Sequence, residues 1–363
     1  MAEYASLDEL YADHGASMVD VGEHVIPAHF GRPERTHLAV RNGVGVSHRP
    51  FDVIEITGSD RIEYLDNAVS NRVPDTPGAG TYALLLDPQG GIRVDLYVLV
   101  GESHVKVLAP AGTGQSLAEE WEETVFIQDV SIREATSDHV CFSVDGPKST
   151  EKLSSIGLGD AIPDTPLHFA GGTLDDIPVT IVRGDALTGE TEYVLLCEPS
   201  EAPRVFDMCL TIGIGAVAYG EETWRSLTLE AGTPLLEPDF TGMIPNIIGL
   251  RSALDFAKGC YVGQEIVSRV ENRGQPSQRL IGLQPASVPT EGAAVFDGDA
   301  AVGEITRAVM SPSLGEAIAF ALVPYDLEAS ALTVRVEGEE VSVARVDLPF
   351  VTGSEQSARI PRY

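Results

Sequence analysis

A hairpin signal at residues 81–100 limits the possible folds more than any other feature of the chain. Two strand-like runs, Thr81–Leu86 and Ile92–Val100, flank the turn-forming segment 87–91, which reads Asp-Pro-Gln-Gly-Gly. Alternation along the second run predicts two faces, one with Ile92, Val94, Leu96 and Val98 and the other with Arg93, Asp95, Tyr97 and Leu99. Because aspartate is disfavoured in mid-strand, Asp95 either points to water or lines a polar cavity.

Helix signals are mixed with strand signals on both sides of this hairpin. The alternating run 51–57 predicts a strand, and a turn then leads into a helix whose cap is Ser59 or Asp60. A second helix is predicted over Glu221–Glu230, ended by Gly232. This mixture, without regular βαβ winding, indicates the α+β fold class.

The chain changes character from about Leu280. Short strand-like runs, frequent turns such as Asp297-Gly298 and a high Val and Ala content follow one another. This pattern predicts a small β-barrel at the C-terminal end.

Charge excludes several classes of partner. The formal net charge is −31 and the sequence pI is near 4.4. Nucleic acid is disfavoured because phosphate contacts need a basic surface, and an anionic membrane surface would repel the chain. Only four lysines occur, and such a lysine-poor, acid-rich composition resembles that of proteins from salt-accumulating halophiles. The alternative is an ordinary acidic mesophile protein.

Cysteine and histidine usage argues against metal sites and disulfides. The four cysteines, at 141, 197, 209 and 260, form no CxxC pair, and the eight histidines form no HxxxH or HExxH cluster. So few cysteines suit a reducing cytosol. The N-terminal segment lacks the apolar region of a signal peptide, and no apolar run approaches the roughly 18 residues of a membrane span. We therefore expect a cytoplasmic protein without a resident metal.

The segment Lys258–Arg269, which reads KGCYVGQEIVSR, identifies a family. It resembles the K-G-C-Y-x-G-Q-E…R motif of the YgfZ family, a folate-binding branch of the glycine-cleavage T-protein superfamily that is associated with maintaining iron–sulfur enzymes. Further stretches resemble the superfamily pattern, including Thr188-Gly189-Glu190 and Leu229-Glu230-Ala231-Gly232.

The resemblance implies a T-protein fold. Two α+β subdomains, expected at residues 1–138 and 139–278, would surround a central folate channel. A C-terminal β-barrel would follow at residues 279–363. The implied cofactor is tetrahydrofolate or a derivative of it.

The resemblance also implies site residues. Asp95 matches the acid that T-proteins place beside the reactive nitrogen of tetrahydrofolate, and Cys260 is the second catalytic candidate. The predicted folate contacts are Tyr82, Leu84, Tyr97, Glu190, Tyr193, Lys258 and Arg269. The alternatives are a solvent-facing Asp95, an inert buried Cys260, and arginines at 251, 269, 273 and 279 that pair with surface acids instead of with folate carboxylates.

Two departures from the T-protein pattern leave the function open. Val194 stands where T-proteins carry a Glu that contacts the pterin, and Ala109 stands where they carry Asn. The main interpretation is therefore a YgfZ-like folate protein that supports iron–sulfur enzymes. The alternatives are an aminomethyltransferase that takes its carbon from a lipoyl carrier protein, a related demethylase, and a non-catalytic folate-binding scaffold.

The charge imbalance predicts a salt-dependent stability. Raising KCl from 0.1 M to 2 M shortens the Debye length to about 3 Å or less, which screens repulsion among the excess carboxylates. We expect the apparent melting temperature, measured by circular dichroism, to rise by at least about 5 °C. An unchanged or lower melting temperature would identify an ordinary acidic protein.

Overall fold

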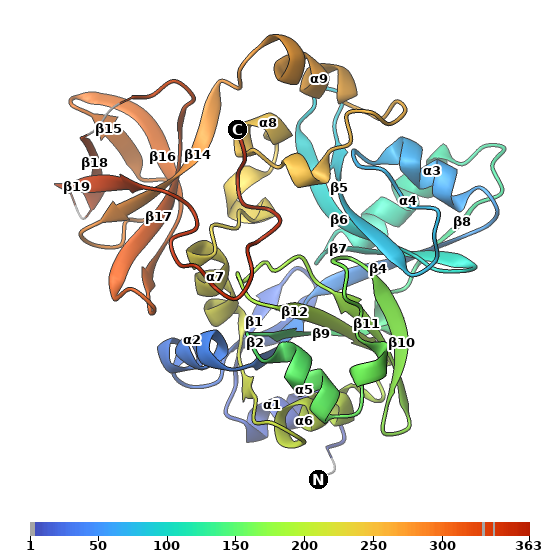
Figure 1. The fold of residues 1–363 in the computed structure, drawn as a ribbon. Coiled ribbons are helices and arrows are strands. Elements are labelled where there is room, and N and C mark those ends of the chain that lie inside the picture. The colour runs from blue at the N-terminus through green and yellow to red at the C-terminus, as the bar shows by residue number, and fades with distance from the viewer. Residues whose placement is uncertain (1–3, 329–330, 337) are drawn as a thin grey trace.

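The computed structural model describes residues 4–328, 331–336 and 338–363. It contains two β-sheets, a two-stranded ribbon and a closed barrel, with helices packed around them (Figure 1). The predicted α+β fold class with a C-terminal barrel is therefore confirmed. Among the described residues, no helix is both long and apolar enough to cross a bilayer.

The first sheet has five strands in the order β5-β6-β7-β4-β8. Its strands are β4 (Phe51–Thr57), β5 (Ala79–Leu86), β6 (Ile92–Val100), β7 (His104–Pro110) and β8 (Ser131–Glu134). The predicted hairpin is its β5–β6 pair, in which Tyr82 lies opposite Tyr97 and Leu84 lies opposite Asp95.

The second sheet has six strands in the order β10-β11-β12-β9-β3-β13. They are β3 (Gly45–Arg49), β9 (Val140–Asp145), β10 (Phe169–Leu174), β11 (Ile177–Arg183), β12 (Glu192–Cys197) and β13 (Val217–Ala218). The early strand β3 pairs with β9, so this sheet draws on chain from both sides of residue 138. The subdomain boundaries given above stay predictions.

The barrel closes in the order β14-β17-β16-β15-β18-β19. Its strands are β14 (Gln278–Pro285), β15 (Ala294–Asp297), β16 (Ala300–Ser311), β17 (Glu316–Pro324), β18 (Leu332–Val336) and β19 (Glu339–Val346). The separate ribbon consists of β1 (Ser17–Val21) and β2 (His24–His29).

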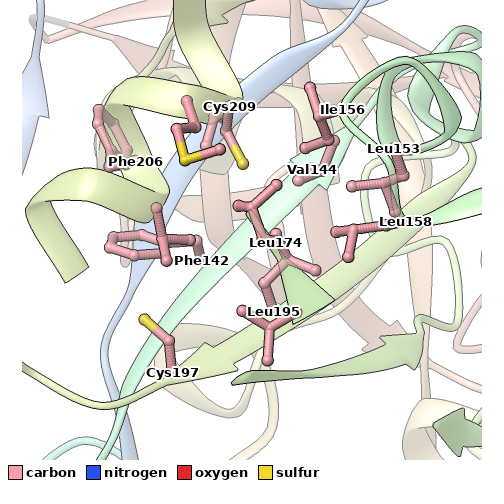
Figure 2. Packing of buried hydrophobic residues seen from close by; sticks show 14 of the residues in the cluster. Phe142, Val144, Leu153, Ile156, Leu158, Leu174, Leu195, Cys197, Phe206 and Cys209 are labelled. Atoms are coloured by element: carbon pink, nitrogen blue, oxygen red, sulfur yellow. The ribbon is translucent and has the colours of Figure 1, made fainter. Parts of the chain in front are cut away.

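Five of the described helices cover the outer faces of the two sheets, and α8 and α9 contribute to the core between them. Their bounds are α1 (Leu7–Asp13), α2 (Pro33–Asn42), α3 (Arg61–Ala68), α4 (Gly114–Thr124), α5 (Ser149–Ser155), α6 (Ala202–Thr211), α7 (Glu221–Glu230), α8 (Pro245–Ile248) and α9 (Gln264–Arg273). Side chains of α1, α5 and α6 pack on the six-stranded sheet, and those of α3 and α4 pack on the five-stranded sheet. Figure 2 shows Phe206 and Cys209 of α6 against Phe142 of β9 and Leu195 of β12.

A third apolar cluster fills the space between the two sheets. Tyr82, Leu84 and Tyr97 of the five-stranded sheet meet Val194 and Leu196 of the six-stranded sheet there. The layers are therefore helices, sheet, shared core, sheet and helices. A cavity at the margin of the shared core can draw side chains from both sheets.

Two predicted helix ends are confirmed. The helix α7 spans Glu221–Glu230, and Gly232 follows it with a φ of +72°, the left-handed conformation that glycine tolerates at a helix end. Asp60 is the N-cap residue of α3, but its side chain makes no cap bond, because it accepts the backbone N–H of Asp129 at 2.8 Å.

The predicted faces of β6 are wrong at two residues, Ile92 and Arg93, and Arg93 pairs with Glu120 of the covering helix α4. A bulge makes Leu85 pair with Val94 and Leu86 pair with Ile92, which leaves Arg93 as the extra residue. Ile92 therefore packs with Tyr97 in the shared core, not with Leu96 on the helix-covered face. Simple alternation cannot anticipate such an insertion.

The chain after the barrel returns to the two sheets. It leaves β19, passes α7 and ends beside α8 (Figure 1). Backbone N–H groups of Val351 and Ala358 donate to the carbonyls of Glu230 and Asp185, and the hydroxyl of the last residue, Tyr363, donates to the carbonyl of Ile247. This C-terminal segment, residues 347–363, places side chains next to the shared core.

A buried carboxylate joins α7 to the barrel and to α2. Glu230 lies 2.9 Å from His37 Nε2 and 3.0 Å from Arg41 Nη2, and it accepts hydroxyl donors from Ser311 at 2.5 Å and Ser313 at 2.8 Å. Burial alone would raise the pKa of Glu230, but His37, Arg41 and Ser311 outweigh it and lower that pKa to about 2.

Replacing Glu230→Gln should destabilise the protein strongly. The amide removes the negative charge and places an NH2 donor where one acceptor oxygen stood, so some of the buried donors lose their acceptor, and the free energy of unfolding in urea should fall by about 3 kcal/mol. The matched variant Glu222→Gln changes an exposed residue of the same helix and should stay within about 0.5 kcal/mol of wild type.

The Glu230 contribution also depends on pH. Because its folded pKa is lowered, the stabilisation is present above the ordinary carboxyl pKa and is lost as pH falls toward 2. The difference in unfolding free energy between wild type and Glu230→Gln should therefore become smaller as the pH is lowered toward 2. A difference that does not change with pH would show that these partners do not lower the pKa of Glu230.

Candidate functional site

A cavity of about 350 Å³ opens where the five-stranded sheet, α7 and the C-terminal segment meet. Its lining includes Arg49, Phe51, Asp95, Tyr97, Trp224 and Arg359. Its volume lies within the range of small-molecule sites, and its walls combine aromatic surface with a few charged groups.

Asp95 forms a polar part of the cavity wall. The residue is 9% exposed, and its Oδ2 accepts Arg359 Nη1 at 2.6 Å and the Tyr82 hydroxyl at 3.2 Å. Both bonds fall on the same oxygen. No partner of Oδ1 is found within the described ranges, so this oxygen is available to a ligand. Asp95 was expected either to point to water or to line a polar cavity, and in the structure it lines the cavity.

Arg359 is held by aromatic rings as well as by carboxylates. Its guanidinium carbon lies 3.9 Å from the Tyr82 ring centroid and 5.0 Å from that of Tyr97. Its Nε lies 3.4 Å from Asp185 Oδ2, and its Nη2 donates to the Tyr97 hydroxyl, which in turn donates to Asp185 Oδ1 at 2.8 Å. Arg359 is therefore a fixed charge.

The two tyrosines are protonated donors. Burial raises the pKa of both the Tyr82 and Tyr97 hydroxyls well above the ordinary range. Their rings form a cross-strand pair with centroids 5.5 Å apart. This pair is the platform on which Arg359 rests.

Glu192 is a second buried carboxyl near this cluster. Burial, followed by the charges of Asp145 and Asp185, raises the pKa of Glu192 well above its usual range. Its Oε2 accepts the N–H of Leu187 at 2.9 Å. A protonated Glu192 adds no negative charge at neutral pH.

The cavity wall also carries a stacked cation. Arg49 lies with its guanidinium carbon 3.7 Å from the Trp224 ring centroid, and its Nη1 contacts Glu221 Oε2 at 3.0 Å. Trp224 and Arg225 follow Glu221 by three and four residues, so one face of α7 supplies these three lining residues.

Of the residues predicted to bind folate, only Tyr97 lines the cavity, and Tyr82 lies directly behind Asp95. Leu84 is buried in the shared core. Glu190 pairs with Arg41 at 2.9 Å, and the Tyr193 hydroxyl contacts Thr150 Oγ1 at 2.9 Å. Contacts of Leu84, Glu190 and Tyr193 with a ligand stay predictions.

The segment Lys258–Arg269 lies away from the cavity lining. The buried Lys258 Nζ donates to the carbonyl oxygens of Asp66, Val69 and Asn71 at the end of α3. Three converging carbonyls suit a compact ammonium, which explains lysine at this position. Cys260 is exposed on the following loop, and Arg269 is an exposed partner of Glu265 at 2.6 Å. Their predicted roles stay untested.

The cavity arginines were not those expected from the sequence. Arg251 pairs with Glu271 on the surface, whereas Arg49, Arg225 and Arg359 line the cavity. Asp185 and Trp224 were also missed. The position of Asp185 two residues after the end of β11, next to the Thr188-Gly189-Glu190 motif, was the one usable signal.

Family models match both parts of the chain. Residues 7–258 match the model described as the GCVT N-terminal domain, and residues 278–352 match the glycine cleavage T-protein C-terminal barrel domain. Both matches agree with the observed sheets and barrel.

Curated relatives and a solved structure agree with these matches. An aminomethyltransferase of Streptomyces coelicolor is 30% identical over 95% of this chain and 96% of its own length. A probable aminomethyltransferase of Natronomonas pharaonis is 29% identical over 95% of this chain and 98% of its own length. The glycine cleavage system aminomethyltransferase T from Bartonella henselae has the same fold, with a TM-score of 0.85 at 22% identity over 96% of this chain and 98% of that one. These names favour the aminomethyltransferase alternative over the YgfZ interpretation.

Glu192 gives the site a pH signature. A carboxyl whose folded pKa is raised contributes stability below its ordinary pKa and loses it as pH rises through the raised value. Between pH 5 and pH 8, wild type should lose about 1–3 kcal/mol more unfolding free energy than Glu192→Gln. Glu198→Gln, on the exposed turn after the same strand, should follow wild type. If the unfolding free energies of wild type and Glu192→Gln changed in parallel with pH, the pKa of Glu192 would not be raised in the folded protein.

Proposed function

Because the chain belongs to the glycine cleavage T-protein family, we propose that it is an aminomethyltransferase whose one-carbon acceptor is tetrahydrofolate. The single observation that carries this proposal is Asp95, a buried carboxylate that lines an aromatic cavity with one oxygen bound and the other available.

The residues of the cavity fit tetrahydrofolate chemically. Phe51, Tyr97 and Trp224 supply flat apolar surface for ring systems. The Asp95 carboxylate can accept hydrogen bonds from ring nitrogens, and arginines can pair with the carboxylates of a glutamyl tail. Val194 lies in the shared core beside these residues, so pterin recognition would depend on Asp95 and its neighbours.

Asp95 has the properties that the transfer requires. Tetrahydrofolate, when bound, supplies a nitrogen that accepts the one-carbon unit. Positive charge develops at the carbon as it leaves its donor, and a fixed carboxylate in a site of low polarity stabilises that charge. The Oδ1 atom of Asp95 is the free acceptor for a proton or an N–H at this point.

Arg359 and Tyr82 position that carboxylate. Both donate to Oδ2, so the carboxylate plane is fixed before a ligand arrives. Preorganisation of this kind avoids reorientation during the reaction. Asp185 balances the guanidinium, so Asp95 is not fully neutralised.

The donor we propose is an aminomethyl group carried by a lipoyl carrier protein. Its transfer would leave the carbon on tetrahydrofolate and release ammonia. Two alternative functions use the same fold. The first is a role in iron–sulfur enzyme maintenance, which is motivated by the resemblance of the segment around the exposed Cys260 to the YgfZ motif. A related demethylase would use the same Asp95 with a methylated small molecule as donor.

Replacing Asp95→Asn should lower turnover by about 100-fold or more, because the amide cannot stabilise developing positive charge. The assay contains aminomethylated lipoyl carrier and tetrahydrofolate in molar KCl and follows methylene-tetrahydrofolate. Asp164→Asn, an exposed control of the same chemistry, should keep wild-type turnover.

Undiminished turnover by Asp95→Asn would remove the proposed role of Asp95. Absence of any turnover in wild type, with tetrahydrofolate binding confirmed by calorimetry, would contradict the transferase proposal and favour the iron–sulfur candidate.

A further inference from the structure

We propose that a cavity between α3 and α4 is the docking site for a basic amphipathic helix of a partner protein. The cavity has a volume of about 580 Å³ and shares no lining residue with the cavity at Asp95. Both helices pack on the outer face of the five-stranded sheet (Figure 1). The proposal therefore does not depend on the reaction assigned to Asp95.

A contact between the two helices holds the cavity in shape. Tyr64 of α3 donates its hydroxyl to the carbonyl of Trp121 at 2.9 Å and lies 2.7 Å from Thr124 Oγ1, both on α4. All three residues line the cavity, together with Leu85 of β5, which belongs to the buried cluster under the helices. A partner thus meets a site that is largely formed before it binds, which lowers the ordering cost of association.

Apolar side chains face solvent beside this cavity. Ile127 lines it and is 94% exposed, and the neighbouring Phe126 is 84% exposed. Within the described part of the chain, these two are the most exposed large apolar side chains. Val262, which is 48% exposed, adds to the lining from the loop before α9. Single exposed apolar residues are common, but a group of them around a cavity is typical of an interaction site.

The charges in the lining favour a basic partner. Asp60, Glu63 and Glu120 line the cavity, and among the described residues no lysine or arginine does so. The cavity at Asp95, by contrast, has three arginines in its lining. Lysine or arginine side chains of a partner can therefore pair with these carboxylates while its apolar side chains cover Ile127.

A second copy of this chain is a poorer occupant. In a dimer with twofold symmetry the same surface meets itself, so Asp60 and Glu63 would face the acids of the other copy. The net charge of −31 adds long-range repulsion between copies. The complementary occupant is a helix with an apolar stripe between basic side chains.

The test uses two synthetic helical peptides of about five turns. Both carry the same leucine stripe, and their polar faces carry either lysine or glutamate. Fluorescence anisotropy measures the binding of each peptide to the full-length protein, in 2 M KCl and in the lowest KCl concentration at which circular dichroism shows the native fold. At the lower salt we expect the lysine peptide to bind at least about 10-fold more tightly than the glutamate peptide, and this ratio should shrink in 2 M KCl because charges are screened.

Apolar substitutions locate the site. The double variant Phe126→Ser/Ile127→Ser should weaken binding of the lysine peptide by at least about 10-fold at both salt concentrations, because burial of apolar surface is not screened by salt. Both side chains are exposed, so the variant should fold like wild type. The matched control Val25→Ser removes an exposed valine of β2 and should change the affinity by less than about 2-fold.

A charge reversal tests the acidic lining. At the lower salt, Glu63→Lys should weaken binding of the lysine peptide by about 3-fold or more. Glu151→Lys changes the net charge by the same amount on an exposed position of α5, and it should change the affinity by less than about 2-fold.

The proposal would be overturned by absence of peptide binding, by equal binding of both peptides at the lower salt, or by wild-type affinity in the double variant. A wild-type dimer in light scattering that the double variant converts to a monomer would also overturn it, because the occupant would then be a second copy. Turnover with tetrahydrofolate should be unchanged in the double variant, so failure here leaves the proposed function intact.

Discussion

The buried ion pair between Asp95 and Arg359 is the contact that joins the separate parts of this molecule into one site. The two residues are 264 positions apart, and Arg359 reaches Asp95 because the C-terminal segment returns from the barrel to the sheets. Burying two charges is costly unless both are paired and hydrogen-bonded. The two tyrosines and Asp185 complete that pairing, so the barrel, the hairpin and the segment after β11 must all be in place together.

The second buried charge cluster supports the first. Glu230 binds α7 to α2 and to the barrel, and the same helix carries Glu221 and Trp224 into the cavity wall. The cavity thus receives Asp95 from the five-stranded sheet and Trp224 from α7.

The sequence predicts the parts of this structure that depend on short-range periodicity. The hairpin, the helix over Glu221–Glu230 and the C-terminal barrel follow from alternation and turn residues, and mid-strand Asp95 was a usable signal for the site. Arg359, Asp185 and Arg49 could not be found this way, because their roles depend on which distant segments pack together. The bulge at Arg93 and the three carbonyls around Lys258 are also consequences of tertiary packing.

A crystal structure of the protein with tetrahydrofolate would test the central claim most directly. We expect a ring nitrogen of the ligand within hydrogen-bond distance of Asp95 Oδ1, with Oδ2 still bound by Arg359 and Tyr82. A ligand bound elsewhere, or a complex in which Arg359 has left Asp95 to take the ligand itself, would contradict the claim that this ion pair preorganises the reacting carboxylate.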